Sequence, residues 1–296
     1  MSAASRPAGA DGATDAIAAR IAALNVHPVK GCGGIAVSSA TAEVTGLGAL
    51  GVRDREWMVV DAAGRFLTQR EHPRLARVAP SVEGASLRLA APNAAPLDVP
   101  LALTQAPSSE VVVWRSHVLG LDQGDAAAAW FSDYLGKRAR LVRFDPAKPR
   151  RCNPDYVGKT GAHTMFADGY PVLVIGQASL DDLNARLAAK RSPALPMNRF
   201  RPNVVVTGLP PYDEDHLDTI ESNGVTLKLV KPCVRCQVTT TDQMTARVGI
   251  EPLATLGMYR RDDALAGVTF GMNAIVVAGA GRPLEAGAAV TVTYRF

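Results

Sequence analysis

The sequence predicts a β-rich α+β fold in two domains, and three observations support this fold class. The chain has 296 residues, about twice the roughly 150 residues of an average domain. Hydrophobic residues make up 47% of it, which is enough to bury a sizeable core and excludes disorder throughout. Most apolar segments are short, rich in β-branched residues and bounded by Gly or Pro, as is typical of β-sandwiches and β-barrels.

Changes in composition divide the chain into a tail and two domains. Residues 1–21 carry small side chains and mixed charge and are expected to form a flexible tail. Residues 22–145 are expected to form an N-terminal domain, a small β-barrel. The Pro-rich, charged stretch 144–151 is expected to connect it to a C-terminal domain, residues 150–296.

In the N-terminal half, alternating apolar residues and turn residues indicate strands. We expect them at residues 35–37, 57–61, 86–89 and 111–114. The segment 46–51 fits G-x-G-x-x-G, but a strand rather than a helix is expected to follow it. Because a dinucleotide site needs a helix there, we interpret this segment as a turn.

Two helices have recognisable start signals. The first is expected over residues 125–135, with Asp125 as its N-cap. The second is expected over residues 179–189, where Ser179 and Asp182 resemble a capping box. Its leucines repeat at helical spacing, so that one apolar face can pack on a sheet.

Strand patterns resume in the C-terminal half. They are expected at residues 203–206, 225–230, 237–240 and 290–294. The uncharged run 264–281 is long enough to raise the question of a membrane helix. It contains several glycines and divides naturally into two short β-rich pieces, so we expect two strands and no membrane contact.

Charge and cysteine content limit the class of partner and the compartment. The net charge is +4 and no long Lys/Arg run occurs, so a nucleic-acid polymer is not expected as a partner. Four cysteines cannot form a disulfide framework in a chain of this length. No signal peptide pattern is recognised at the N-terminus, and we expect a cytoplasmic location.

The sharpest local motif is the C-x-x-C formed by Cys233 and Cys236. A zinc knuckle would need a second such pair, and a thioredoxin-type dithiol would need a helix after the first cysteine. The third interpretation is a thiolate favoured by the cations Lys231 and Arg235. Such a sulfur can be a nucleophile, a persulfide carrier or a soft-metal ligand. A redox-silent pair of half-buried cysteines is the alternative.

Several basic residues stand beside Gly, Pro or Asn, where the backbone is easily exposed. Examples are Lys30, Arg55 and Arg201. An Arg in a turn next to free amides is a good receptor for a small anion. The alternative is that each of them is an ordinary solvated surface residue.

Seven segments in order resemble the MOSC superfamily. They are residues 27–32, 51–59, 68–75, 166–171, 178–184, 198–203 and 233–242. The resemblance is to the branch with an N-terminal β-barrel domain, which includes the mitochondrial amidoxime-reducing component and its bacterial relatives. It implies that residues 150–296 form a MOSC β-barrel domain with flanking helices. No C-terminal ferredoxin domain is expected, because the chain ends just after its last expected strand.

The resemblance implies a molybdenum cofactor, with one pyranopterin dithiolene on the metal and Cys236 as the protein thiolate. No iron–sulfur cluster is expected in this chain. The positions that match the family's cofactor contacts are Lys30, Gly31, Arg55, Asp168, Gly169, Tyr170, Arg201, Asn203, Val234 and Arg235. Because these residues come from both halves, the cofactor is expected between the two domains. Asp242 is a candidate proton donor, with a structural role in a turn as the alternative.

The implied activity is that of an oxidoreductase: the reduction of small N-hydroxylated compounds, with electrons from a separate reductase or ferredoxin-type protein. The alternatives are a persulfide sulfur carrier and a protein that only binds and delivers the cofactor. At the superfamily level the resemblance also implies pyridoxal phosphate binding. The sequence departs from the family pattern in several places, for example at Gly31, Gly169 and Tyr170, where relatives carry hydroxyl side chains, and at Gln243, where many have Pro.

Overall fold

The computed structural model describes residues 19–102 and 106–295. The predicted tail lies outside these residues up to position 18. Its last two residues, Arg20 and Ile21, are the start of a strand, because the Ile21 side chain is buried in the core.

A nine-stranded sheet is the largest element of the fold, and it contains strands from both ends of the chain. Along the sheet the order is β2 (Ile35–Val37), β1 (Arg20–Val26), β16 (Val204–Thr207), β15 (Val172–Gly176), β20 (Gly267–Ala278), β18 (Val225–Val234), β17 (Leu217–Ser222) and β22 (Thr291–Tyr294), with β19 (Arg261–Asp262) beside β20. Strands β15 and β16 are parallel, and the other strand pairs of this sheet are antiparallel. Strand β1, the first strand of the described residues, thus pairs with a strand of the C-terminal half.

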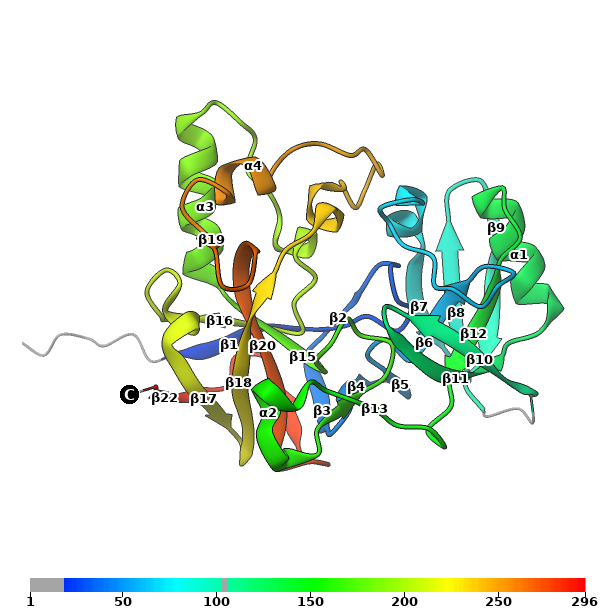
Figure 1. The fold of residues 1–296 in the computed structure, drawn as a ribbon, viewed down its shortest axis with the longest axis horizontal. Coiled ribbons are helices and arrows are strands. Elements are labelled where there is room, and N and C mark those ends of the chain that lie inside the picture. The colour runs from blue at the N-terminus through cyan, green and yellow to red at the C-terminus, as the bar shows by residue number, and fades with distance from the viewer. Residues whose placement is uncertain (1–18, 103–105, 296) are drawn as a thin grey trace, which may run out of the picture.

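A second lobe is built from two antiparallel sheets and one helix. One sheet has the order β10 (Ser108–Val113), β11 (Ser116–Asp122), β12 (Arg140–Phe144) and β6 (Trp57–Val60). The other is formed by β7 (Ala79–Glu83), β8 (Ser86–Ala91) and β9 (Ala94–Pro100). Figure 1 shows this lobe with α1 (Asp125–Leu135) on the right and the nine-stranded sheet on the left.

Smaller sheets lie between the lobes. Strands β3 (Ser39–Glu43), β4 (Gly46–Ala49) and β5 (Val52–Arg53) pair with β21 (Pro283–Glu285) from near the C-terminus. The two-stranded sheet is β13 (Arg150–Arg151) with β14 (His163–Thr164). In the G-x-G-x-x-G segment, residues 46–49 form β4 and only Leu50 and Gly51 lie in the turn that leads into β5, so the turn interpretation holds for the last two residues alone.

The two predicted helices are present, with corrections at their starts. Helix α1 has Gly124, not Asp125, at its N-cap position. Helix α3 (Gln177–Ala189) begins two residues earlier than predicted, so Ser179 lies inside it. The Ser179 hydroxyl does not cap the helix, because it donates a hydrogen bond to the buried carboxylate of Glu214 at 2.7 Å. The short helices are α2 (Pro154–Val157), α4 (Leu253–Leu256) and the 3-10 turns η1 (Pro73–Arg77), η2 (Gly158–Thr160), η3 (Met197–Arg199), η4 (Asp213–His216) and η5 (Gln237–Thr240).

Two strand predictions in the C-terminal half are wrong. Residues 237–240 form η5 instead of a strand, because the hydroxyls of Thr239 and Thr240 bond back to the carbonyls of Cys236 and Gln237. The run predicted as two strands is the single strand β20, whose irregular pairing with β18 accommodates Gly271 at φ 75°.

Across the described residues, no helix has both the length and the apolar character that crossing a bilayer requires. Strand β20 contains most of the uncharged run 264–281, which is long enough for a membrane helix. Its residues Phe270 to Ile275 are largely buried between the sheet and α3 or in the neighbouring core.

Candidate functional site

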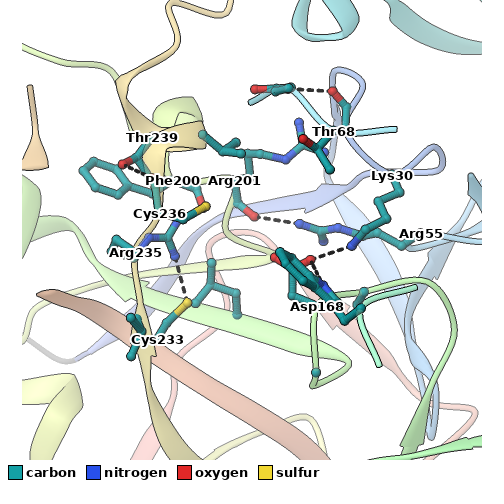
Figure 2. Close-up of a pocket in the computed structure, with 18 of the residues that line it drawn as sticks. Lys30, Arg55, Thr68, Asp168, Phe200, Arg201, Cys233, Arg235, Cys236 and Thr239 are labelled. Atoms are coloured by element: carbon teal, nitrogen blue, oxygen red, sulfur yellow. Dashed lines mark hydrogen bonds and ion pairs between the residues drawn. The ribbon is translucent and has the colours of Figure 1, made fainter. Parts of the chain in front are cut away.

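A pocket with a cavity volume of about 130 Å³, open to solvent on one side, lies where the two lobes meet. All the residues assigned to cofactor binding line it, together with Cys236: Lys30, Gly31, Arg55, Asp168, Gly169, Tyr170, Arg201, Asn203, Val234 and Arg235. Figure 2 shows the thiols of Cys233 and Cys236 on one side and Lys30 and Asp168 on the other, with Arg201 between them.

The two cysteines of the C-x-x-C occupy different environments. Strand β18 ends at Val234, so Cys233 lies in the strand and packs against the apolar cluster that contains Phe200. Its sulfur accepts a hydrogen bond from Arg235 Nη1 at 2.9 Å. Cys236 follows the strand and precedes η5, is partly exposed, and lines the pocket. Among the described residues no donor bonds to its sulfur, which leaves Cys236 the freer ligand.

The cations expected beside the C-x-x-C behave differently from each other. Arg235 is directed to Cys233 and to the carbonyl of Phe200. Lys231 points elsewhere, because its ammonium lies 4.3 Å from the centre of the Tyr156 ring. A single guanidinium, not a pair of cations, therefore accompanies the thiols.

Arg55 is fixed by a buried network. It donates to the carboxylate of Asp54, which is 2% exposed, and to the carbonyl of Arg201 at 3.2 Å. Asn203 Nδ2 donates to the second oxygen of Asp54 at 2.8 Å, and its Oδ1 accepts from the amide of Leu173. This network joins the loop before β6 to the loop before β16. Arg55 is thus not an ordinary surface residue.

Arg201 and Lys30 are the two most enclosed cations of the pocket, each at 8% exposure. Burial lowers the pKa of Arg201 to about 10, and the positive charge of Arg55 contributes to the same shift. One guanidinium nitrogen donates to the carbonyl of Cys32. Its second terminal nitrogen, Nη2, is buried and has no partner among the described residues, and the same holds for Arg235 Nε. Both nitrogens belong to residues that line the pocket, and each lacks the acceptor that a buried N–H group normally has.

The ion pair of Lys30 and Asp168 lines the other end of the pocket. The ammonium of Lys30 is paired with Asp168 Oδ1, which also accepts from Trp114 Nε1 at 3.0 Å. Burial lowers the pKa of Lys30, and the charges of Arg150 and Arg55 add to this effect although Asp168 opposes it. The Asp168 side chain is 74% exposed, and the part of it that is enclosed in the pocket would raise its pKa. The charge of Lys30 and the hydrogen bonds from Lys30 and Trp114 outweigh this effect and hold the pKa of Asp168 well below its usual range. The Asp168 carboxyl is therefore ionised at neutral pH.

Three residues that depart from the family pattern, Gly31, Gly169 and Tyr170, all line the pocket. Gly31 has φ 81°, and its carbonyl accepts from the buried Gln69 amide at 2.6 Å. A Cβ at Gly169 would meet nothing within 4 Å, so the loop there leaves space for a ligand. Tyr170 supplies a ring, edge-on to Tyr156 at 6.3 Å, and burial raises the pKa of its hydroxyl. No hydroxyl replaces those of the relatives at Gly31 or Gly169.

Asp242 does not line the pocket. Its carboxylate pairs with Arg199 at 2.9 Å and accepts from the amides of Met244 and Thr245. Partial burial would raise the pKa of Asp242, but the hydrogen bonds from Thr245 and the charge of Arg199 keep it below the ordinary value. A carboxyl that is ionised at neutral pH has no proton to donate, so these contacts favour the alternative role in a turn.

Arg150 is a site residue that sequence reasoning missed. It was placed in the connection between domains, but the side chain is buried, at 8% exposure. It donates to the carbonyls of Met165, Ala167 and Asp168 and to the hydroxyl of Ser116. It therefore fixes the loop that carries Asp168 and Gly169. Nothing in the charged, Pro-rich local sequence distinguishes this Arg from its exposed neighbour.

Replacing Arg150 by Met should release this loop. The loss of hydrogen bonds from a buried guanidinium should lower the free energy of unfolding by about 3 kcal/mol. Hydrogen exchange of the amides of residues 165–169 should become faster in the folded protein. Arg151→Met is the matched control, because the Arg151 side chain is exposed. Unchanged exchange in the Arg150 variant would contradict the role of a loop clamp.

Two further features of the pocket were not expected. Phe66, Arg70 and Trp114 line it next to Lys30. Next to Gly31, the side-chain amides of Gln69 and Gln243 donate hydrogen bonds to each other, at 3.2 and 3.4 Å. These hydrogen bonds connect the two lobes. Gln243 stands where many relatives carry Pro, so that departure was the signal available in the sequence.

The donor set fits a cofactor that brings its own metal ligands and an anionic group. Among residues 19–102 and 106–295, no group of three or more His, Cys, Asp or Glu is placed to bind a metal ion. A metal at Cys236 would thus have one protein thiolate and would need other ligands from the cofactor, as a dithiolene provides. The unpartnered N–H groups of Arg201 and Arg235 are suited to donate hydrogen bonds to the oxygen atoms of an anion.

Comparisons with known proteins cover both halves of the chain. The family of the MOSC N-terminal beta barrel domain matches residues 18–138, and that of the MOSC domain matches residues 161–291. Human mitochondrial amidoxime-reducing component 1 is 35% identical over 253 residues, which cover 82% of this chain and 72% of the relative. Rat mitochondrial amidoxime reducing component 2 is 37% identical over 248 residues, which cover 80% and 71%.

Solved structures also include a partial match. The solution structure of a protein from Bordetella bronchiseptica is 32% identical, and the match covers 31% of this chain and 73% of that protein, with a TM-score of 0.29.

Proposed function

The chain belongs to the MOSC family, in the branch that carries a MOSC N-terminal β-barrel domain and includes the mitochondrial amidoxime-reducing components, and from this premise we propose that it is a molybdenum-cofactor-dependent reductase of N-hydroxylated compounds. The observation that carries the proposal is one pocket that combines a free thiol, Cys236, with two arginines, Arg201 and Arg235, each of which has one buried nitrogen without a partner among the described residues. This combination supplies both a soft-metal ligand and a receptor for an anionic cofactor.

Cys236 would hold the metal, and Arg201, Arg55 and Lys30 would compensate the charge of the pterin phosphate. The remaining contacts would come from Gly31, Asp168, Gly169, Tyr170, Asn203, Val234 and Arg235. When bound, the cofactor supplies the two-electron chemistry that removes oxygen from an N–O bond. The chain's own residues would bind and orient the cofactor: Arg201 and Arg235 line the pocket and each has one N–H group without a partner among the described residues, and the Asp54 network fixes Arg55.

The test measures molybdenum and pterin per chain, and then the reduction of benzamidoxime with a chemical electron donor. We expect close to one equivalent of each and conversion to the amidine. Absence of both metal and pterin, with a persulfide on Cys236 or Cys233, would favour the sulfur-carrier alternative. Bound cofactor without reduction of any N-hydroxylated compound would favour the delivery alternative.

Electron supply gives a further prediction. The chain has four cysteines, of which Cys32 and Cys152 are buried and apart from the C-x-x-C. Too few thiols remain to ligate an iron–sulfur cluster beside the metal. We therefore expect no turnover with NADH alone and full turnover with a separate reductase or an artificial donor. NADH-driven turnover by the purified chain would contradict this.

Two expectations from the sequence stay predictions. A cytoplasmic location is one, and the relatives named above are mitochondrial by their names. Pyridoxal phosphate binding, implied only at the superfamily level, is the other, and the proposed function does not use it.

A further inference from the structure

Trp114 occupies a backbone position that suits glycine. Strands β10 and β11 form a hairpin in which Val113 pairs with Ser116, so Trp114 and Arg115 are the two turn residues. Trp114 has φ 56°, in the left-handed region that is unfavourable for a bulky L-residue. Glycine at the first position of such a turn would carry no strain. This backbone strain indicates that position 114 carries Trp because its indole ring has a function, since the turn alone would favour Gly.

The indole is held in place by three neighbours. Its Nε1 donates to Asp168 at 3.0 Å, its ring lies 5.0 Å from that of Phe66, and the guanidinium of Arg70 lies 4.6 Å from its centre. It is nevertheless 40% exposed and lines the pocket. Among the exposed large hydrophobic side chains of the described residues, only Trp114 and Val234 line this pocket.

The surroundings define the ligand that this ring suits. An aromatic side chain fixed beside a cavity offers a stacking surface at little entropic cost. Lys30 and Arg70 make the rim cationic, while Asp168 adds a carboxylate. A planar conjugated ring with polar substituents can stack there and bond to these groups.

We propose that Trp114 is a stacking platform for a planar conjugated ring bound in the pocket. The role rests on the proposed function, which offers two ligands of this chemistry: the pterin ring of the cofactor and an aromatic N-hydroxylated substrate. Trp114 is a binding residue that the family motif does not include.

The first arm of the test measures binding to cofactor-free protein by calorimetry, with pterin-6-carboxylate and benzamidoxime as probes. Trp114→Gly removes the ring and relieves the backbone strain. Trp114→Phe keeps a ring but loses the hydrogen bond to Asp168. Arg115→Ala is the matched control, because Arg115 shares the turn, is exposed and does not line the pocket.

We expect Trp114→Gly to weaken at least one probe by about 5- to 100-fold, as for the loss of one stacking partner. Trp114→Phe should stay within about threefold of the wild type, since Phe retains a stacking face. The probe whose affinity falls shows whether Trp114 stacks on the pterin ring or on the substrate. Equal affinity of wild type and Trp114→Gly for both probes, or no binding to either protein, would overturn the proposal. So would equal losses in the Gly and Phe variants, which would assign the effect to the hydrogen bond.

The second arm uses the cofactor-containing protein and compares kcat/KM for benzamidoxime with that for acetamidoxime, which lacks a ring. If Trp114 stacks on the substrate, Trp114→Gly should lower the ratio of kcat/KM for benzamidoxime to kcat/KM for acetamidoxime. If Trp114 stacks on the pterin, this ratio should stay unchanged and pterin should be lost faster on gel filtration. If the wild type reduces neither compound, the proposed function fails. The first arm still decides the role of Trp114 in that case, because it requires no turnover.

Discussion

Replacing Cys236 by Ser should abolish reductase activity and remove most of the bound molybdenum. An alcohol is a far poorer ligand for a soft metal than a thiolate is. Mutation of a residue that only orients a metal ligand already lowers metal affinity or activity by about 10–100-fold. Loss of the ligand itself should therefore lower activity by more than about 100-fold. Molybdenum per chain and the rate of benzamidoxime reduction are the two measurements.

Cys233→Ser is the matched control for this prediction. The Cys233 sulfur accepts a hydrogen bond from Arg235 and packs in an apolar cluster, and a serine hydroxyl can accept the same bond. We therefore expect a modest loss of stability and most of the molybdenum retained. Equal effects of the two substitutions, or a larger effect at Cys233, would show that the metal ligand is not Cys236.

Replacing Arg201 by Ala should lower the affinity for the cofactor by about 10- to 150-fold, which corresponds to about 1.5–3 kcal/mol for a set of charge-assisted hydrogen bonds. Arg201 is buried and one of its nitrogens has no partner among the described residues, so its main unmet interaction is with a ligand. Arg201→Lys should rescue only part of the affinity, because a point charge cannot reproduce the planar fork. Pterin retained per chain after gel filtration is the measurement.

Arg55 should behave differently from Arg201, because it neutralises the buried carboxylate of Asp54. Arg55→Ala should lower pterin retention and also destabilise the cofactor-free protein, by about 3–5 kcal/mol for an uncompensated buried charge. Arg53→Ala is the control, since Arg53 is 45% exposed and lies outside the pocket lining. Full pterin retention in both Arg201→Ala and Arg55→Ala would remove the main support for a cofactor between the lobes.

The β-rich fold class, the two long helices and the residues that gather in the pocket can all be predicted from the amino-acid sequence. These predictions rest on local patterns: α1 and α3 show apolar residues at helical spacing, and β6 or β16 are short runs of β-branched residues between turns. The site residues were carried over from ordered motifs, each of which is local in the sequence. Their meeting in one pocket follows because both halves contribute loops to the same place.

The pairing of the strands, the burial of individual side chains and the polar groups that lack a partner become visible only in the folded structure. Strand β1 joins the C-terminal half through pairs such as Arg20 with Thr207, a contact between residues that no local pattern connects. Residues 237–240 have strand-forming side chains, yet their hydroxyls satisfy nearby carbonyls and form η5. Arg150 resembles its neighbour Arg151 in sequence, but burial makes it the clamp of the Asp168 loop. Burial and hydrogen-bond satisfaction depend on the whole fold, because the groups that enclose a residue come from distant parts of the chain.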